Sequence, residues 1–152
     1  MKGLSLTQPW ATLIALNAKR IETRSWATSY RGLLAVHASK GFPRDCQQLC
    51  ATEPFRAVLL AAGIEHTKAL PVGAIVAVAR LVGCTRTERI RMNVDERERA
   101  FGDYAAGRFG FFLHEVRPLI SPISCKGALG LWTVPPEVCD AMAVQLRGTS
   151  DV

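Results

Sequence analysis

The 152-residue sequence lacks the features of several large protein classes. No apolar run approaches the roughly 18 residues needed to cross a bilayer, so we expect no membrane partner. No small-residue cleavage site follows the N-terminal residues, which argues against a signal peptide and favours a cytoplasmic protein. Internal repeats, linkers and low-complexity segments are also absent, and the length suits one domain over 1–152 with a tail fraying after about 145.

Cysteine is sparse and irregularly placed. Five cysteines are scattered along the chain, and an odd number without a frame argues against a disulfide scaffold. His37, His66 and His114 show no ligand spacing to them, so we expect buried thiols, no metal and no cofactor. The sequence also contains no glycine-rich phosphate-binding loop and no Ser, His and Asp in an order and context typical of a catalytic triad.

Acidic residues are scarce in one part of the chain only. The net charge is +6, and residues 1–50 carry seven Lys and Arg against two acids. Nearly all of the excess therefore lies in the N-terminal third, which favours a polyanionic partner. A mildly basic surface that binds no anion remains the alternative.

Hydrophobic patterning predicts short strands mixed with helices. A helix should begin near Gln8 and Pro9 and end at Asn17, a residue that tolerates the left-handed conformation. The expected strands are 2–6, 20–24, 33–37, 74–84, 109–116 and 129–134, and the other expected helices are 42–63 (broken at 52–54), 95–101 and one from Pro135. Because regular crossover helices are lacking, we expect an α+β fold around a small mixed or antiparallel β-barrel of five or six strands.

The segment NAKRIETRSWATSYRG, residues 17 to 32, carries unusual charge and aromatic content. In a strand of period two, Glu22 and Arg24 lie on one face about 7 Å apart, two steps of about 3.3 Å. Lys19 has the wrong parity and joins them only from the turn after the helix. The alternative is a solvated edge strand whose ion pairs each contribute about 0–1 kcal/mol.

This segment also resembles a known signature. The run N-A-K-R-I-E-T-R at 17–24 is similar to the G-x-K-x-x-E-x-R signature of ASCH domains, members of the PUA-like superfamily, with Asn17 at the glycine position. The flanks LSLTQPWATLIAL, HASKG, FGDYAAGRFGF and GALGLW extend the likeness to about residue 136. The resemblance implies a six-stranded barrel with a cleft at the signature, used for binding RNA or modified nucleobases.

The residue types suggest a role for each candidate. Lys19 and Arg24 are suited to holding an anion, and Glu22 to accepting hydrogen bonds from a base amine or acting as a general base. The other candidates are Trp26 and Tyr30 for stacking, Arg31, Lys40 and Lys126 for phosphates, and Asp103, Tyr104 and Arg108 in a loop over the cleft. Packing is the competing role for Trp26 and Tyr30, and the expected role of Trp10, Trp132 and His37.

We therefore predict a domain that binds RNA, single-stranded nucleic acid or a modified nucleoside. The alternative is a metal-independent hydrolase, either an amidohydrolase on acylated cytidine or a ribonuclease, with Lys19 paired with Glu22 or Asp103. The resemblance implies this alternative, since some ASCH relatives resemble amidohydrolases that use Lys, Thr and Glu. Their lysine aligns with Lys19, but their threonine aligns with Glu22, and this departure weakens the transfer of the chemistry. A protein partner with an acidic surface is a third possibility.

Overall fold

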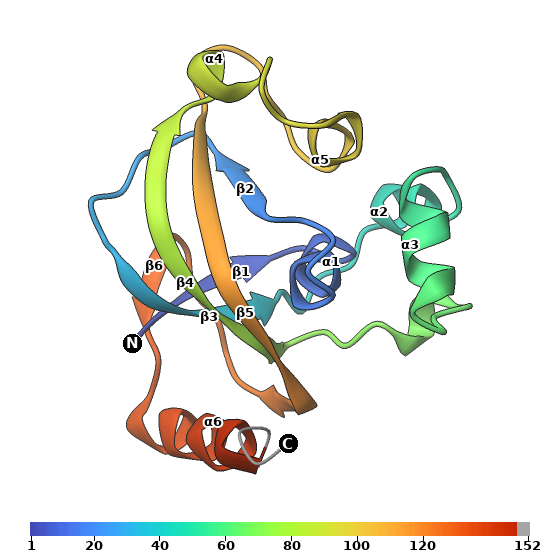
Figure 1. Cartoon of the computed structure of the whole chain (residues 1–152). Coiled ribbons are helices and arrows are strands. Elements are labelled where there is room, and N and C mark those ends of the chain that lie inside the picture. The colour runs from blue at the N-terminus through green and yellow to red at the C-terminus, as the bar shows by residue number, and fades with distance from the viewer. Residues whose placement is uncertain (149–152) are drawn as a thin grey trace.

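The computed structural model describes residues 1–148 and contains one curled sheet of six strands (Figure 1). The strand order is β2-β5-β4-β3-β1-β6, and β1 and β3 are the parallel pair while all other neighbours are antiparallel. The bounds are β1 Lys2–Leu6, β2 Ile21–Arg24, β3 Gly32–Ala38, β4 Ala74–Arg86, β5 Phe109–Ser124 and β6 Leu131–Thr133. The two ends of this order, β2 and β6, are not hydrogen-bonded within the described residues, so the barrel is open. The expected α+β fold with a mixed barrel is confirmed.

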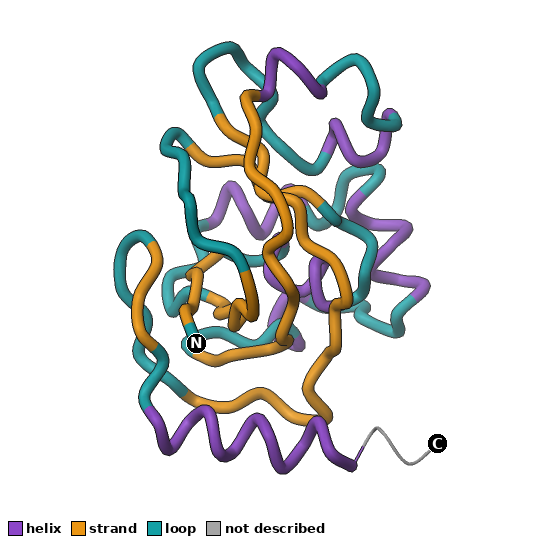
Figure 2. The backbone as a smooth tube through the Cα atoms, turned by 60° about the vertical axis from the view of Figure 1, so that its left-hand side comes forward, coloured by secondary structure: helices purple, strands orange, loops and turns teal. Residues whose placement is uncertain are grey.

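Short helices surround the open barrel on several sides. Their bounds are α1 Trp10–Ala15, α2 Arg44–Leu49, α3 Phe55–Ala61, α4 Thr87–Ile90, α5 Glu96–Ala100 and α6 Pro136–Gly148, with a 3₁₀ turn at Thr67–Ala69. Helices α1, α2 and α3 gather on one flank of the sheet, whereas α6 lies along the C-terminal half of β5 (Figures 1 and 2). The amide of Gln145 ties α6 to β5 by bonding the backbone of Ser121 in both directions.

Helix α1 begins and ends as its sequence predicts. The carboxamide oxygen of buried Gln8 accepts a hydrogen bond from the backbone N–H of Thr12 at 3.0 Å, and its Nε2 donates to the Pro71 carbonyl at 2.8 Å. Asn17 ends the helix with φ of 58°, the left-handed conformation expected of it. The chain therefore turns sharply before β2 begins.

Strand β5 is the largest difference from the predicted elements. The prediction stopped at 116, whereas the strand continues to Ser124 through Pro118 and Pro122. Proline is tolerated there because β2 pairs with β5 only from Phe109 to Phe112, which leaves the later residues on an open edge. Helix α4 and the 3₁₀ turn are too short to leave a periodic pattern and were not predicted. Helix α6 extends to Gly148, three residues past the start of the expected tail, and 149–152 lie outside the described residues.

Within residues 1–148, buried apolar side chains form three clusters, one of which positions the site. The first fills the barrel and includes Leu4, Leu34, Val36, Leu81 and Phe111. The second lies between the sheet and α6 and contains Met142 and Trp132, which confirms the packing role expected of Trp132. The third joins α1 and α3 to the segment after α5 through Leu13, Phe55 and Phe101, and it holds these three elements at one end of the barrel.

Gly3 offers a test of how closely β1 packs against Trp132. A Cβ at Gly3 would lie 2.7 to 2.9 Å from three atoms of the Trp132 ring, too close to be accommodated without a shift. We expect Gly3→Ala to lower the free energy of unfolding by about 1–3 kcal/mol in urea titrations. Gly41→Ala is the control, because no heavy atom lies within 4 Å of the added Cβ, and equal stability of the two variants would contradict the packing.

Candidate functional site

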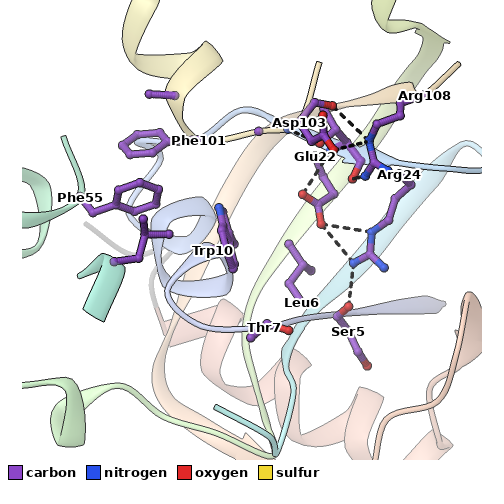
Figure 3. Close-up of a pocket in the computed structure, with 14 residues that line it drawn as sticks. Ser5, Leu6, Thr7, Trp10, Glu22, Arg24, Phe55, Phe101, Asp103 and Arg108 are labelled. Atoms are coloured by element: carbon purple, nitrogen blue, oxygen red, sulfur yellow. Dashed lines mark hydrogen bonds and ion pairs between the residues drawn. The ribbon is translucent and has the colours of Figure 1, made fainter. Parts of the chain in front are cut away.

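A cavity of about 460 Å³ lies where the end of β1, strand β2, helices α1 and α3 and the segment after α5 meet (Figure 3). Charged side chains form one side of it and aromatic rings the other. The charged side comprises Glu22, Arg24, Asp103 and Arg108, and the aromatic side comprises Trp10, Phe55 and Phe101. Ser5, Leu6 and Thr7 close the cavity below.

Strand β2 delivers the first charged pair with the parity expected from its sequence. Glu22 Oε2 accepts from Arg24 Nε at 3.1 Å and lies 3.1 Å from Arg24 Nη2, which also donates to the Ser5 carbonyl at 2.7 Å. The Glu22 side chain is 11% exposed and that of Arg24 is 24% exposed. Both therefore have fixed positions at the cavity wall, and Arg24 Nη1 has no hydrogen-bond partner in residues 1–148.

The segment after α5 supplies a second pair of an arginine and a carboxylate, Arg108 and Asp103. Arg108 Nε lies 3.5 Å from Asp103 Oδ2 and donates to the Asp103 carbonyl, while Nη2 donates to the Thr23 carbonyl at 3.3 Å. The backbone N–H of Asp103 in turn donates to Thr23 Oγ1 at 2.9 Å. The segment is thereby held against β2, and Asp103 and Arg108 line the cavity.

The aromatic side combines two buried rings with one accessible ring. Phe55 and Phe101 are 4% and 1% exposed, and their centroids are 5.0 Å apart in an edge-to-face arrangement. Trp10 packs at 88° against Phe55 with a centroid distance of 6.2 Å and is only partly buried. Trp10 is therefore the ring that a planar ligand in the cavity would meet.

Lys19 is not among the residues that line the cavity. Its side chain is fully buried, and Nζ donates to the Phe101 carbonyl at 2.8 Å and lies 3.6 Å from Glu22 Oε1. Burial lowers the pKa of the Lys19 ammonium, and the negative charges of Glu22 and Glu98 oppose that shift. The expected meeting of Lys19 with Glu22 occurs, but the ammonium faces the protein interior and not a ligand.

Three other sequence candidates lie outside the cavity. Trp26 packs against Phe111 of the barrel core at a centroid distance of 5.1 Å and 79°. The Tyr30 hydroxyl donates to the Leu33 carbonyl at 2.5 Å. Arg31 is exposed and bonds the nearby carbonyls of Thr28 and Tyr30. The stacking role foreseen for Trp26 and Tyr30 thus has no support from their positions.

The remaining candidates divide between the interior and another cavity. Tyr104 is 7% exposed, and its hydroxyl has no hydrogen-bond partner among residues 1–148. It is therefore part of the packing under the loop rather than a lid. Lys40 and Lys126 line a second cavity, as does Ser5, which the two cavities share.

Sequence reasoning missed the aromatic wall. Trp10 was expected in the core because its spacing to Leu13 and Ile14 matches one helix face, yet it begins α1 and lines the cavity. Its place directly after a strand that enters the site was the available signal. Phe55 and Phe101 carried no such signal, because their contacts with this region come from elements distant in sequence.

The described residues hold neither a metal-binding cluster nor a membrane-spanning helix. In residues 1–148, no group of three or more His, Cys, Asp and Glu side chains is placed to hold a metal ion. The same residues contain no helix long and apolar enough to cross a bilayer. All five cysteines are free thiols, each partly buried.

Comparisons with known proteins agree on one family. The ASCH domain model matches residues 4–120. Activating signal cointegrator 1 of Homo sapiens is 27% identical over 137 residues, which cover 89% of this chain and 22% of that protein, and the Mus musculus protein is 26% identical over the same share. The chain thus spans about a fifth of these relatives. The crystal structure of ASCH from Zymomonas mobilis superposes with a TM-score of 0.56 at 13% identity over 94% of this chain and 93% of the other, a likeness of fold.

The buried Lys19–Glu22 pair should be strongly coupled in stability. Removing Glu22 leaves the buried ammonium of Lys19 without its carboxylate, so Glu22→Gln should cost about 3–5 kcal/mol in urea unfolding, and Lys19→Met should cost less because Glu22 keeps its ion pair with Arg24. The double variant should cost less than the sum, with a coupling of about 0.5–3 kcal/mol. The exposed Arg80–Glu115 pair, 2.9 Å apart, is the control and should couple by no more than about 1 kcal/mol. Additive costs at Lys19 and Glu22 would contradict the ion pair.

Glu98 should make stability depend on pH. Its Oε1 accepts from the backbone N–H of Arg20 at 2.6 Å, Oε2 has no partner in residues 1–148, and burial raises the pKa of the carboxyl above 4.5. The folded state therefore holds this proton more tightly than the unfolded state, and the contribution of Glu98 to stability falls as pH rises above 4.5. Urea unfolding at pH 4, 5.5 and 7 should show wild type losing stability relative to Glu98→Gln, by about 1.4 kcal/mol per unit of pKa shift. A difference independent of pH would contradict this, and Glu96→Gln on the same helix is the control.

Proposed function

From the premise that the chain belongs to the ASCH domain family, with its PUA-like fold, we propose that it binds single-stranded RNA by taking one nucleobase into the first cavity. The observation that carries the proposal is the two-sided lining: a partly exposed indole faces fixed carboxylates and guanidinium groups. A base has the matching two-sided chemistry, with a π-face and a polar edge.

The cavity has the size and the apolar wall that a base requires. Its volume of about 460 Å³ falls within the range of roughly 300–1,000 Å³ typical of small-ligand sites. Trp10 offers its ring for stacking, which is worth about 1–3 kcal/mol per base. Phe55 packs against that ring and Phe101 packs against Phe55, so stacking would require little reordering.

The polar wall suits a base that carries an exocyclic amine beside a ring acceptor. Glu22 can accept from the amine, and the Nη1 of Arg24 can donate to the acceptor. Both groups are held in advance, Glu22 by Lys19 and Arg24 by the Ser5 carbonyl. Little conformational entropy is then lost on binding, and a ligand that leaves these charges unpaired is rejected.

Hydrolysis has less support from the arrangement. Lys19, the residue that a catalytic role would need, is fully buried with its ammonium donating to the Phe101 carbonyl. Thr23 Oγ1, the hydroxyl within the signature, accepts from the Asp103 backbone N–H. Turnover of N4-acetylcytidine or labelled RNA in the absence of metal would establish the enzyme in place of the binding domain.

Arg24→Ala tests the polar wall. It removes donors that are fixed on Glu22 and Ser5, so affinity for a fluorescein-labelled RNA nonamer should fall by about 1.5–3 kcal/mol, tenfold or more, in anisotropy titrations at 50 mM salt. Arg80→Ala is the matched control, because it removes one exposed arginine and one Arg–Glu pair outside the cavity. The control should bind within twofold of wild type.

Tryptophan fluorescence reports on the aromatic wall in the same titration. Binding should quench the Trp10 emission, so Trp10→Phe should lose the signal whereas Trp26→Phe, in the core, should keep it. No affinity of wild type for single-stranded oligonucleotides at low salt would remove the proposed function. RNA affinity that is unchanged in Arg24→Ala, together with a fluorescence signal that is unchanged in Trp10→Phe, would place the ligand elsewhere on the protein.

A further inference from the structure

A second cavity, of about 900 Å³, meets the first one at Ser5. It is bordered by the ends of β1 and β3, the segment before β4 and the segment after β5. Among its lining residues are Lys40, Gly73, Lys126 and Gly127. None of the signature residues lines it, so the function proposed above leaves this cavity unexplained.

The two cavities differ in charge. The first has two carboxylates and two guanidinium groups, whereas the second has Lys40 and Lys126 and no acidic residue in its lining. Neither lysine forms an ion pair within the described part of the chain, and both are exposed. Lys40 lies along Gly73, since a Cβ there would be 3.9 Å from the lysine Cβ and Cγ. The two charged side chains that line the second cavity are therefore both positive.

The lining of the second cavity next to Ser5 is uncharged and held by hydrogen bonds. His37 is 3% exposed, its Nε2 bonds the Cys125 carbonyl at 2.7 Å, and its Nδ1 bonds Ser5 Oγ at 2.9 Å. Because a carbonyl only accepts, Nε2 carries the proton and Nδ1 accepts from Ser5, while the indole N–H of Trp132 donates to Ser5 Oγ at 3.2 Å. Burial also lowers the pKa of His37, which keeps the ring neutral. Gly127 packs directly on His37 and Ser5, because a Cβ added at Gly127 would lie 2.7 Å from the His37 ring.

We propose that the second cavity binds the phosphodiester backbone of the same strand, next to the nucleotide whose base occupies the first cavity. This inference rests on the proposed function. The strand passes Ser5 and places its neighbouring phosphates against Lys40 and Lys126. Each cavity then does what its charge allows: balanced donors and acceptors contact a base edge, and unopposed ammonium groups contact phosphates.

The proposal predicts that the two lysines affect the affinity for an oligonucleotide but not the affinity for a nucleoside. A nucleoside reaches only the first cavity, so its affinity is independent of the two lysines. An oligonucleotide gains contacts with two phosphates, and each phosphate neutralised on a single strand adds about 0.7 to the slope of log affinity against log salt. Loss of both lysines should therefore lower that slope by about 1.4.

The test compares cytidine with a cytidine nonamer, since cytosine has an exocyclic amine beside a ring acceptor. In Lys40→Gln/Lys126→Gln, affinity for the RNA nonamer at 50 mM salt should fall about tenfold, with the reduced slope, and affinity for cytidine should match wild type. Lys2→Gln/Lys68→Gln is the matched control, because it removes the same charge from residues that line neither cavity. This control should retain most of the nonamer affinity and the full slope.

The outcomes separate the two proposals. Equal nonamer affinity and slope in the two double variants would overturn the backbone subsite, even if cytidine binds and quenches Trp10. Failure of cytidine to bind wild type, with nonamer binding that depends on Lys40 and Lys126, would support the phosphate contacts and refute the base cavity. Loss of cytidine affinity in the Lys40/Lys126 variant would also overturn the subsite as drawn, because the lysines would then act on the base cavity.

Discussion

The site depends on a charge placed where water cannot reach it. Lys19 is fully buried, and burying an isolated ammonium costs several kcal/mol, so it must be compensated by the Phe101 carbonyl and by Glu22. Glu22 is in turn held by Arg24, and Arg24 by the Ser5 carbonyl. Four segments of the chain are thereby joined in one line of electrostatic contacts, and the cavity lies over its outer end.

The two basic residues in this series of contacts, Lys19 and Arg24, have different roles. The inner one, Lys19, fixes the position of the carboxylate and contacts no solvent, whereas the outer one, Arg24, keeps N–H groups directed away from its protein partners. Fixed charges of both signs favour correct orientation of a ligand more than raw affinity. The affinity would come from stacking on Trp10 and, for a polymer, from phosphates at the neighbouring positive cavity.

Features that depend on residues close together in the sequence could be predicted. Burial, which depends on residues far apart in the sequence, could not. Strand period placed Glu22 and Arg24 on one face, and the left-handed preference of Asn17 ended the helix before them. Burial of Lys19 depends on Phe101, 82 residues away, which no local pattern encodes. Tryptophan shows the same limit: Trp26 lies beside the signature yet packs in the barrel, whereas Trp10, on an apparently buried helix face, lines the cavity.

Ser5 links the two cavities through different atoms. Its carbonyl accepts from Arg24 on one side, and its hydroxyl bonds His37 and Trp132 on the other. A substitution at Ser5 would remove the hydroxyl and its contacts with His37 and Trp132, whereas the backbone carbonyl that holds Arg24 would remain. The side chains that reach only one cavity carry the mechanistic information, because each can be removed while the shared strand end stays in place.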